Sequence, residues 1–327
     1  MSAPRVAIAG AGVVLSGLLG GCGASAPAPP SAVPPSAVPH RAASTTPVSA
    51  PATDSTNPSN TTNTSGAAAQ PADSFRPVPA GSDLTQLVTP LGRLLRIDPR
   101  TLEVALVPGT AEPGGTFPEG GQVPLARRDA LVAATNAGFK RADARGGEVV
   151  DGRTVGTLRP GAATLVVRSN GTFDVGAWNT PHGVTPAPGD VVVVQNLSLL
   201  VDQGQAVPDL GTDILGRWGL TFRPAVPVSV WRSGLGIDAR GRLLYAAGPN
   251  LVPAQLAELL LSGGAVRAMQ LDINHLWVFA IAFAHPDPSH PESVQGQALL
   301  PGMTPSVNHV LAPGARDFIA VYRRVTH

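Results

Sequence analysis

Two reactive residue types are nearly absent from this chain of 327 residues. Lys140 is the only lysine among the 23 Lys and Arg residues, and Cys22 is the only cysteine. A domain that begins beyond Cys22 therefore contains no disulfide, no thiolate metal site and no cysteine nucleophile.

The chain also lacks a large net charge of either sign. The 23 basic residues are balanced by 22 acidic ones, the formal net charge is +1, and no basic run stands out. Nucleic-acid binding needs a basic surface, so we expect no nucleic-acid partner and a small or neutral ligand instead. Four histidines, His182, His285, His290 and His309, lie in proline-rich or loop contexts and lack the spacing of metal ligands. We assign them no role and predict no metal site, and the sequence does not identify a cofactor.

The apolar run at the N-terminus, residues 6–19, is too short to span a bilayer, which needs about 20 residues. It follows the positive Arg5 and ends in small residues directly before Cys22. This arrangement resembles a bacterial lipoprotein signal, in which the cysteine is lipidated and becomes the mature N-terminus. We therefore expect residues 1–22 to be a signal peptide, Cys22 to be the lipidation site, and the protein to reside on the outer face of the cell membrane, held there by its lipid alone.

Apolar and charged residues are both rare in the next segment, residues 23–74, which consists mainly of Ala, Pro, Ser, Thr and Asn. Such a segment buries too little apolar surface to offset the entropy of ordering, so it is predicted to be disordered. An extended tether for the following domain fits this composition. An unstructured segment without a spacing role predicts the same sequence.

The pattern changes after Phe75 to short β-branched runs bounded by Gly and Pro, which predict strands. Helix signals are few, so residues 75–327 are predicted to be one α+β domain, a strand-rich mixed sheet with a few interspersed helices. The best helix candidate is 252–264, with Pro253 in its first turn and two glycines at its end, and a second covers Pro124 to about Leu131. The clearest strands are 93–97, 103–107, 163–169, 190–196 and 318–324.

Polar residues interrupt the apolar runs at four places. Asn136 follows the run 131–134 and stands beside Ala137 and Gly138, where a small backbone suits ligand contact, although Asn also favours turns. Gln195 and Asn196 separate two apolar runs, and they could bond a ligand or a neighbouring backbone equally well. Further along, Arg232 precedes a glycine-rich strand with a hairpin turn expected at 239–241. The fourth place is Leu271-Asp272-Ile273-Asn274-His275.

These four segments, taken in order, resemble the motifs of the phosphodiester glycosidase family, with similarity from about Leu84 to the C-terminus. The family includes the enzyme that uncovers mannose 6-phosphate and many bacterial proteins associated with exopolysaccharides. In the last motif Asp272 matches, whereas Ile273, Asn274 and His275 stand where the family usually has Gly-Gly and a small hydroxyl residue. The Leu-Asp-Ile-Asn pattern resembles a subgroup of secreted bacterial relatives.

The resemblance implies cleavage of a glycosidic bond between a sugar and a phosphodiester, on cell-envelope or exopolysaccharide glycans. The departing phosphate monoester has a second pKa of about 6, so it needs a cation more than a general acid. On this hypothesis Arg232 holds the phosphate and Asp272 is the base or nucleophile. A structural ion pair between these two residues is the alternative. The residues assigned to sugar hydroxyls or phosphate oxygens are Asn136, Gly138, Gln195, Asn196 and Asn274.

Strand geometry leaves two interpretations of His275. If the strand continues through 276, His275 faces the side opposite Asp272 and is a core histidine, which is the interpretation we favour here. If the strand ends at Asp272, His275 lies on a loop at the rim of the pocket and is a possible acid. At the level of function, the rival to the hydrolase is a non-catalytic module that binds a carbohydrate or sugar-phosphate ligand.

Overall fold

The computed structural model describes residues 74–211, 214–219 and 228–324. The expectations for the signal peptide and Cys22, and nearly all of the proposed tether, concern residues outside these ranges. In the described part of the chain, no helix combines the length and the apolar character needed to cross a bilayer.

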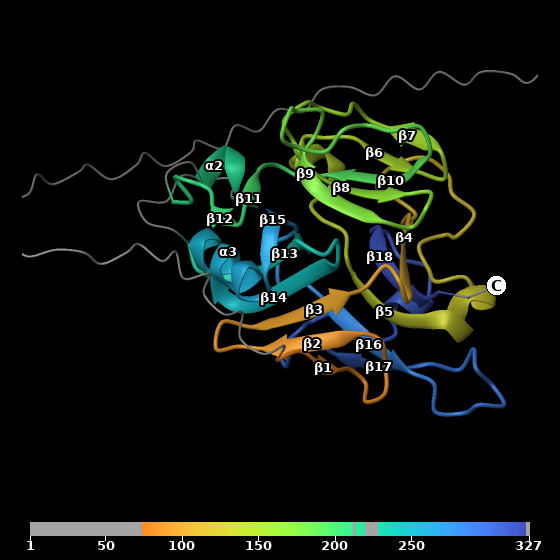
Figure 1. Ribbon diagram of the computed structural model, residues 1–327. Coiled ribbons are helices and arrows are strands. Elements are labelled where there is room, and N and C mark those ends of the chain that lie inside the picture. The colour runs from red at the N-terminus through yellow and green to blue at the C-terminus, as the bar shows by residue number, and fades with distance from the viewer. Residues whose placement is uncertain (1–73, 212–213, 220–227, 325–327) are drawn as a thin grey trace, which may run out of the picture. The chain divides into compact units, whose positions relative to one another are not determined.

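The strands of the described chain form three antiparallel sheets (Figure 1). The largest has eight strands in the order β1 (Arg76–Pro77), β2 (Thr85–Val88), β3 (Arg93–Ile97), β14 (Leu243–Leu251), β13 (Val230–Asp238), β15 (Ala265–Gln270), β11 (Leu199–Asp202) and β12 (Gln205–Ala206). A second sheet has the order β7 (Arg153–Val155), β6 (Glu148–Val150), β10 (Asp190–Gln195), β8 (Ala163–Arg168) and β9 (Phe173–Ala177). The third has the order β17 (Gln295–Ala298), β16 (Ala280–Ala284), β5 (Leu131–Asn136), β18 (Phe318–Arg323) and β4 (Leu102–Val107).

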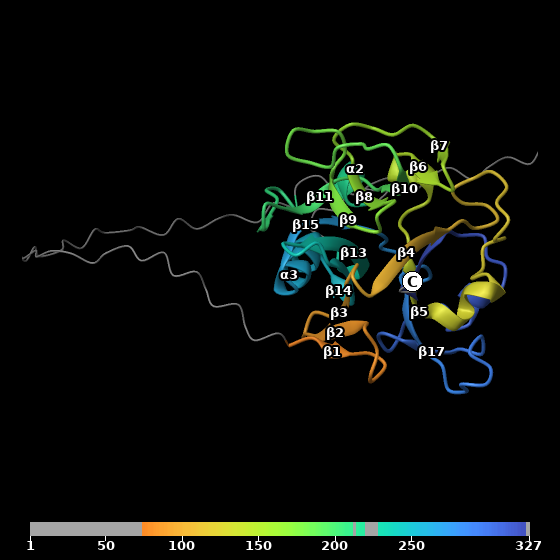
Figure 2. The same cartoon turned by 45° about the vertical axis from the view of Figure 1, so that its right-hand side comes forward.

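Helices are short except for α3 (Pro253–Ser262), which packs on the eight-stranded sheet against β14, β15 and β13 (Figure 2). Its buried face includes Leu256, Leu259 and Leu260. Gln255 accepts a hydrogen bond from the Val252 N–H at 3.0 Å, which satisfies one donor at the start of the helix. The remaining helical segments are α1 (Arg141–Ala144), α2 (Ile214–Arg217) and the 3-10 turns Leu125–Ala130 and His309–Leu311.

The strand-rich expectation is confirmed. All five predicted strands are present within a residue or so of their expected bounds, as β3, β4, β8, β10 and β18. The first predicted helix is α3, and the second is a 3-10 turn. The predicted hairpin turn joins β13 to β14, where Gly241 has φ +74° and its N–H donates to Asp238 O. The fold is nonetheless mostly β, with helices in a minor role.

One apolar core joins the three sheets. Leu235 and Met269 of the eight-stranded sheet, Leu165 of the second, and Val132 and Val321 of the third belong to the same buried cluster. Because each sheet supplies one face to this cluster, the ends of strands from different sheets converge at its margin. The candidate site lies at such a margin.

Candidate functional site

A pocket of about 480 Å³ opens where three segments leave or enter strands. The chain after β5, the chain after β15 and the residues just before β18 supply most of its wall. The register explains the meeting of the first and third segments: Phe318 of β18 pairs with Asn136 of β5, so Arg316 lies opposite Gly138. The lining residues are Phe139, Lys140, Asp143, Gly219, Asp272, Ile273, Asn274, His275, Trp277 and Arg316.

Asp272 lies buried at this pocket, 3% exposed, and its two carboxylate oxygens have different surroundings. Oδ1 accepts the N–H groups of Ile273 at 2.7 Å and Asn274 at 2.9 Å, so it caps the turn that follows β15. The side chain of Asn274 then accepts the N–H of Leu276 at 3.0 Å. Two successive polar side chains thus close the turn at the place where the family pattern has glycines.

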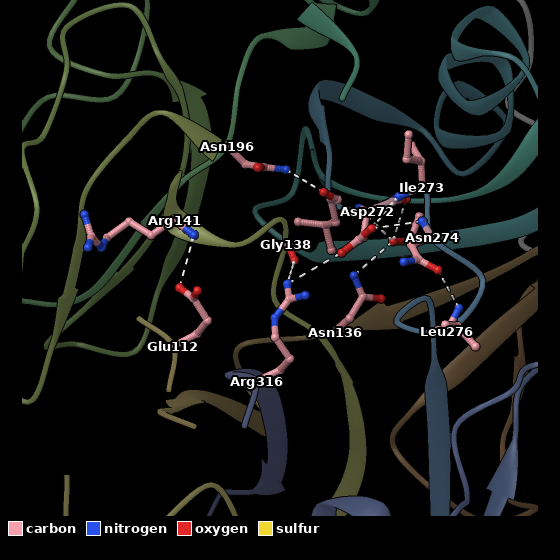
Figure 3. A network of polar contacts seen from close by, with 12 residues as sticks. Glu112, Asn136, Gly138, Arg141, Asn196, Asp272, Ile273, Asn274, Leu276 and Arg316 are labelled. Carbon is pink, nitrogen blue, oxygen red and sulfur yellow. Dashed lines mark hydrogen bonds and ion pairs between the residues drawn. The ribbon is translucent and has the colours of Figure 1, made fainter. Parts of the chain in front are cut away.

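The second oxygen of Asp272 faces Arg316, whose Nη2 lies 3.6 Å from Oδ2 (Figure 3). The same Nη2 donates to Gly138 O at 2.7 Å, which ties the guanidinium to the segment after β5. The Arg316 carbon Cζ also stands 5.1 Å from the ring centre of Trp277. Nε of Arg316 is buried and has no hydrogen-bond partner, so one donor of the guanidinium is unsatisfied.

Opposing effects act on the pKa of Asp272. Burial raises it above the ordinary value of an aspartate, and this is the largest effect. The N–H groups of Asn274 and Ile273 and the charge of Arg316 act in the opposite direction. Because the net shift is upward, this carboxylate holds a proton more tightly than a solvated one and is correspondingly a stronger base.

Two further buried carboxylates, Glu148 and Asp317, interact electrostatically with Arg316. Burial, with Asp317 and Glu112 next in order, raises the pKa of Glu148 to about 9. The pKa of Asp317 is raised to about 6, chiefly by burial, although Arg316 opposes the shift. Glu148 Oε2 has no hydrogen-bond partner. Arg316 is therefore the centre of an acidic environment, of which Asp272 is the member that reaches the pocket.

His275 is exposed and lies in the turn at the pocket, so the core interpretation of this residue was wrong. The reason is that β15 ends at Gln270 and the side-chain alternation of a strand does not extend to His275. Trp277 and Leu276 of the same turn are 37% and 49% exposed. The loop alternative thus describes the observed structure, with Asn274, His275 and Trp277 lining the pocket.

Asn136 is buried behind the pocket and does not line it. Its Nδ2 donates to Ser233 Oγ at 3.0 Å, and its Oδ1 accepts from Tyr245 OH at 2.8 Å and from Phe279 N at 3.3 Å. Ser233 Oγ in turn accepts the N–H of Asp272 at 3.2 Å. Asn136 therefore reaches Asp272 through one intervening side chain and links strands of two sheets.

Gln195 and Asn196 form hydrogen bonds with neighbouring backbone groups. Of the two interpretations that the sequence left open, a ligand or a neighbouring backbone, the structure shows the second. Oε1 of Gln195 accepts the N–H groups of Arg159 at 2.7 Å and Gly147 at 3.2 Å. Asn196 Nδ2 donates to the carbonyls of Gln270 at 2.5 Å and Leu271 at 2.7 Å, directly before Asp272. Both are buried and neither lines the pocket.

Gly138 brings the backbone close to Asn196. A Cβ added to Gly138 would lie 3.5 Å from Asn196 Cγ, which is an ordinary contact distance. The carbonyl of Gly138 is already used by Arg316. Asn196 and Gly138 thus support the wall of the pocket from behind.

Arg232 lies away from the pocket lining and is 0% exposed. Its donors bind Leu251 O at 2.7 Å, Gln270 Oε1 at 2.7 Å and Val228 O at 3.0 Å. Burial lowers its pKa to about 10. The alternation of β13 explains this placement, since Ser233 faces Asp272 and Arg232 faces the other side. The ion pair that the structure shows for Asp272 is with Arg316 and not with Arg232.

Two residues of the site, Arg316 and Lys140, were not predicted from the sequence. Arg316 stands two residues before a predicted strand, next to Asp317, and an Arg-Asp pair at the start of a buried run was the only local signal. Lys140 follows the Asn-Ala-Gly-Phe motif, and its only distinction in the sequence is that it is the single lysine. In the described ranges, no three histidine, cysteine, aspartate or glutamate side chains are grouped so as to bind a metal ion.

No family model matches the sequence, and no curated protein matches it either. Solved structures with a similar arrangement include the catalytic domain of zebrafish N-acetylglucosamine-1-phosphodiester alpha-N-acetylglucosaminidase, auto-inhibited by its pro-peptide. That match has 16% identity and a TM-score of 0.46, and it covers 74% of this chain and 82% of the zebrafish one. A protein from Synechocystis matches with 16% identity and a TM-score of 0.39, over 74% of this chain and 62% of that one. A protein from Burkholderia pseudomallei K96243 matches with 15% identity and a TM-score of 0.40, over 74% and 75%. These values describe a distant likeness in fold.

Proposed function

We propose that this protein hydrolyses the glycosidic bond between a sugar and a phosphodiester, in the pocket that contains Asp272 and Arg316. The observation that carries the proposal is their juxtaposition: a buried carboxylate with a raised pKa stands 3.6 Å from the guanidinium of Arg316, and both residues line a pocket of about 480 Å³. The sequence motifs that resemble the phosphodiester glycosidase family point to the same chemistry.

The reaction requires little of the protein beyond these two groups. Oδ2 of Asp272 either takes a proton from water or attacks the anomeric carbon, while Oδ1 stays fixed by two backbone N–H groups. As the C–O bond breaks, its electron pair goes to the phosphate oxygen, and Arg316 stabilises the charge that develops there. His275 at the rim is the candidate proton donor.

Trp277 offers the pocket an apolar ring face, on which the carbon face of a sugar ring can pack. Asn274 lines the same wall, and its amide group is placed to meet sugar hydroxyls. The pocket therefore combines a carboxylate, a cation, an aromatic face and an amide, which suits a sugar with an anionic aglycone.

The test is hydrolysis of a sugar 1-phosphodiester by the wild type and by Asp272→Asn. Asparagine keeps the oxygen that caps the turn but lacks the carboxylate charge, so the fold is expected to persist. Turnover should fall at least about 10²-fold, the usual scale for a positioned base. Release of the free sugar and the melting temperature are the measurements.

Asp238→Asn is the matched control, because Asp238 is also a buried, ion-paired aspartate, 2.6 Å from Arg242, but lies at the β13–β14 hairpin. It should lose stability without a comparable loss of turnover. Unchanged turnover in Asp272→Asn would contradict the proposed role of this residue. Wild-type protein that binds the diester but never cleaves it would support the glycan-binding module instead.

A further inference from the structure

Lys140 is the only lysine of a chain that uses arginine at every other basic position. It lines the same pocket as Asp272 and Arg316. Its side chain is exposed, and among the described residues its ammonium group forms no ion pair within 4.0 Å. Asp143, which also lines the pocket, is exposed, and the two side chains are not ion-paired.

The segment that carries Lys140 is fixed to Arg316. Gly138 O accepts Nη2 of Arg316 at 2.7 Å, and Lys140 follows two residues later. The two cations thus reach one pocket from separate parts of the chain, one after β5 and the other before β18. A guanidinium binds a phosphate oxygen through a planar fork, whereas an ammonium acts as a point charge with three donors, so the two groups can serve different oxygens of the same phosphate.

On the basis of the proposed function, we propose that Lys140 and Arg316 hold the phosphate group from two sides, and that Lys140 makes the site select phosphate-bearing glycosides over neutral ones. When water replaces the phosphate at the anomeric carbon, the diester with one negative charge becomes a monoester with close to two. The released proton passes to Asp272 or to solvent. The second cation therefore stabilises the departing group more than the bound substrate, which is the condition for raising the rate.

The first test measures the rate at which Lys140, the single lysine, is acylated. An amine-acylating reagent modifies Lys140, and mass spectrometry of the peptide that contains it gives the rate, with Nα-acetyl-lysine in the same tube to correct for consumption of the reagent. Inorganic phosphate and a sugar 1-phosphate should slow the acylation of Lys140 several-fold. A neutral methyl glycoside and sodium chloride at matched ionic strength should not. Equal acylation rates with and without phosphate would overturn the inference.

The second test compares kinetics in Lys140→Gln and Lys140→Arg. Lys140→Gln should lower kcat/KM for the sugar 1-phosphodiester at least about 10-fold, the effect of one charge-assisted contact, and leave any hydrolysis of a neutral aryl glycoside unchanged. Lys140→Arg, which keeps the charge, should recover much of the loss. Arg100→Gln is the control, since Arg100 is an exposed cation paired with Asp98 away from the pocket.

The two proposals fail in different ways. If phosphate protects Lys140 but no diester is hydrolysed, the phosphate site stands and the hydrolase falls. If the diester is hydrolysed but phosphate gives no protection and Lys140→Gln behaves like the wild type, the hydrolase stands and the role of Lys140 falls.

Discussion

Asp272 combines a structural and a chemical task in one side chain. Its Oδ1 closes the turn after β15, and its Oδ2 faces Arg316 across 3.6 Å. Ser233 holds the backbone of Asp272 on both sides, because Ser233 N donates to Asp272 O at 2.9 Å and Ser233 Oγ accepts from Asp272 N at 3.2 Å. The carboxylate is thus fixed in place before any ligand arrives, which is the preorganisation that catalysis requires.

Arg316→Gln provides a prediction at this scale through the pKa of Asp272. Burial raises that pKa and Arg316 lowers it, so removal of the guanidinium should raise it further. Because the deprotonated carboxylate is the active form, kcat is lost as the pH falls through this pKa. The acid limb of the kcat profile should therefore move to higher pH in Arg316→Gln, together with a lower maximum.

The measurement is a pH profile of kcat for the sugar 1-phosphodiester. Arg267→Gln is the control, because Arg267 is also an ion-paired, half-buried arginine, 2.5 Å from Asp174, but lies outside the pocket. Its acid limb should match that of the wild type. An acid limb that stays in place in Arg316→Gln would show that Arg316 does not act on the titrating group.

At the scale of elements, β13 separates two environments. Ser233 and Leu235 face the side of Asp272 and of the apolar core that joins the three sheets. Gly234 faces α3, where Leu256 and Leu260 lie against the strand. The glycine lets the helix approach the sheet closely, and this contact supports the strand from which Ser233 holds Asp272.

Gly234→Ala should therefore destabilise the fold. A Cβ at this position would lie 2.8 Å from Met269 O and 3.1 Å from Leu260 Cδ1, and the backbone carbonyl cannot move aside easily. Overpacking of this kind costs about 1–3 kcal/mol. Urea unfolding monitored by circular dichroism measures the change, and an unfolding free energy equal to that of the wild type would refute the close packing of α3 on β13.

For the whole molecule, the buried carboxylates near Arg316 make stability depend on pH. Glu148 has a pKa raised to about 9, so it retains its proton in the folded state at pH values where the unfolded chain has released it. A raised folded pKa contributes stability that is full below the unfolded pKa and is lost as the pH rises through the folded one. For Glu148 this loss extends from about pH 4.5 to about 9.

Glu148→Gln should remove this loss, because the amide does not titrate. Within this window one group with a raised pKa changes the unfolding free energy by up to about 1.4 kcal/mol per pH unit. The variant should gain stability relative to the wild type as the pH increases from 5 to 8, which melting temperatures across that range would show. Glu258→Gln on α3 serves as a control. If the melting temperatures of Glu148→Gln and the wild type depend on pH in the same way, the prediction is contradicted.

Much of the local structure followed from the sequence. The strands at 93–97 and 318–324 and helix α3 depend on residue type and on contacts within a few positions, and these are visible in a linear pattern. The polar residues of Leu-Asp-Ile-Asn pointed to Asp272, which does line a pocket. The turn that exposes His275 was also encoded, because Asp272 and Asn274 cap it with their own side chains.

Which arginine meets Asp272 was decided only by the tertiary structure. Arg232 is one residue from Ser233, yet strand alternation turns its guanidinium to the far side of the sheet. Arg316 is distant in sequence but reaches Asp272 because the register of β18 against β5 places it opposite Gly138. A sequence by itself determines interactions that are local along the chain, whereas a site assembled from several strand ends depends on register and packing, which are set by the fold as a whole.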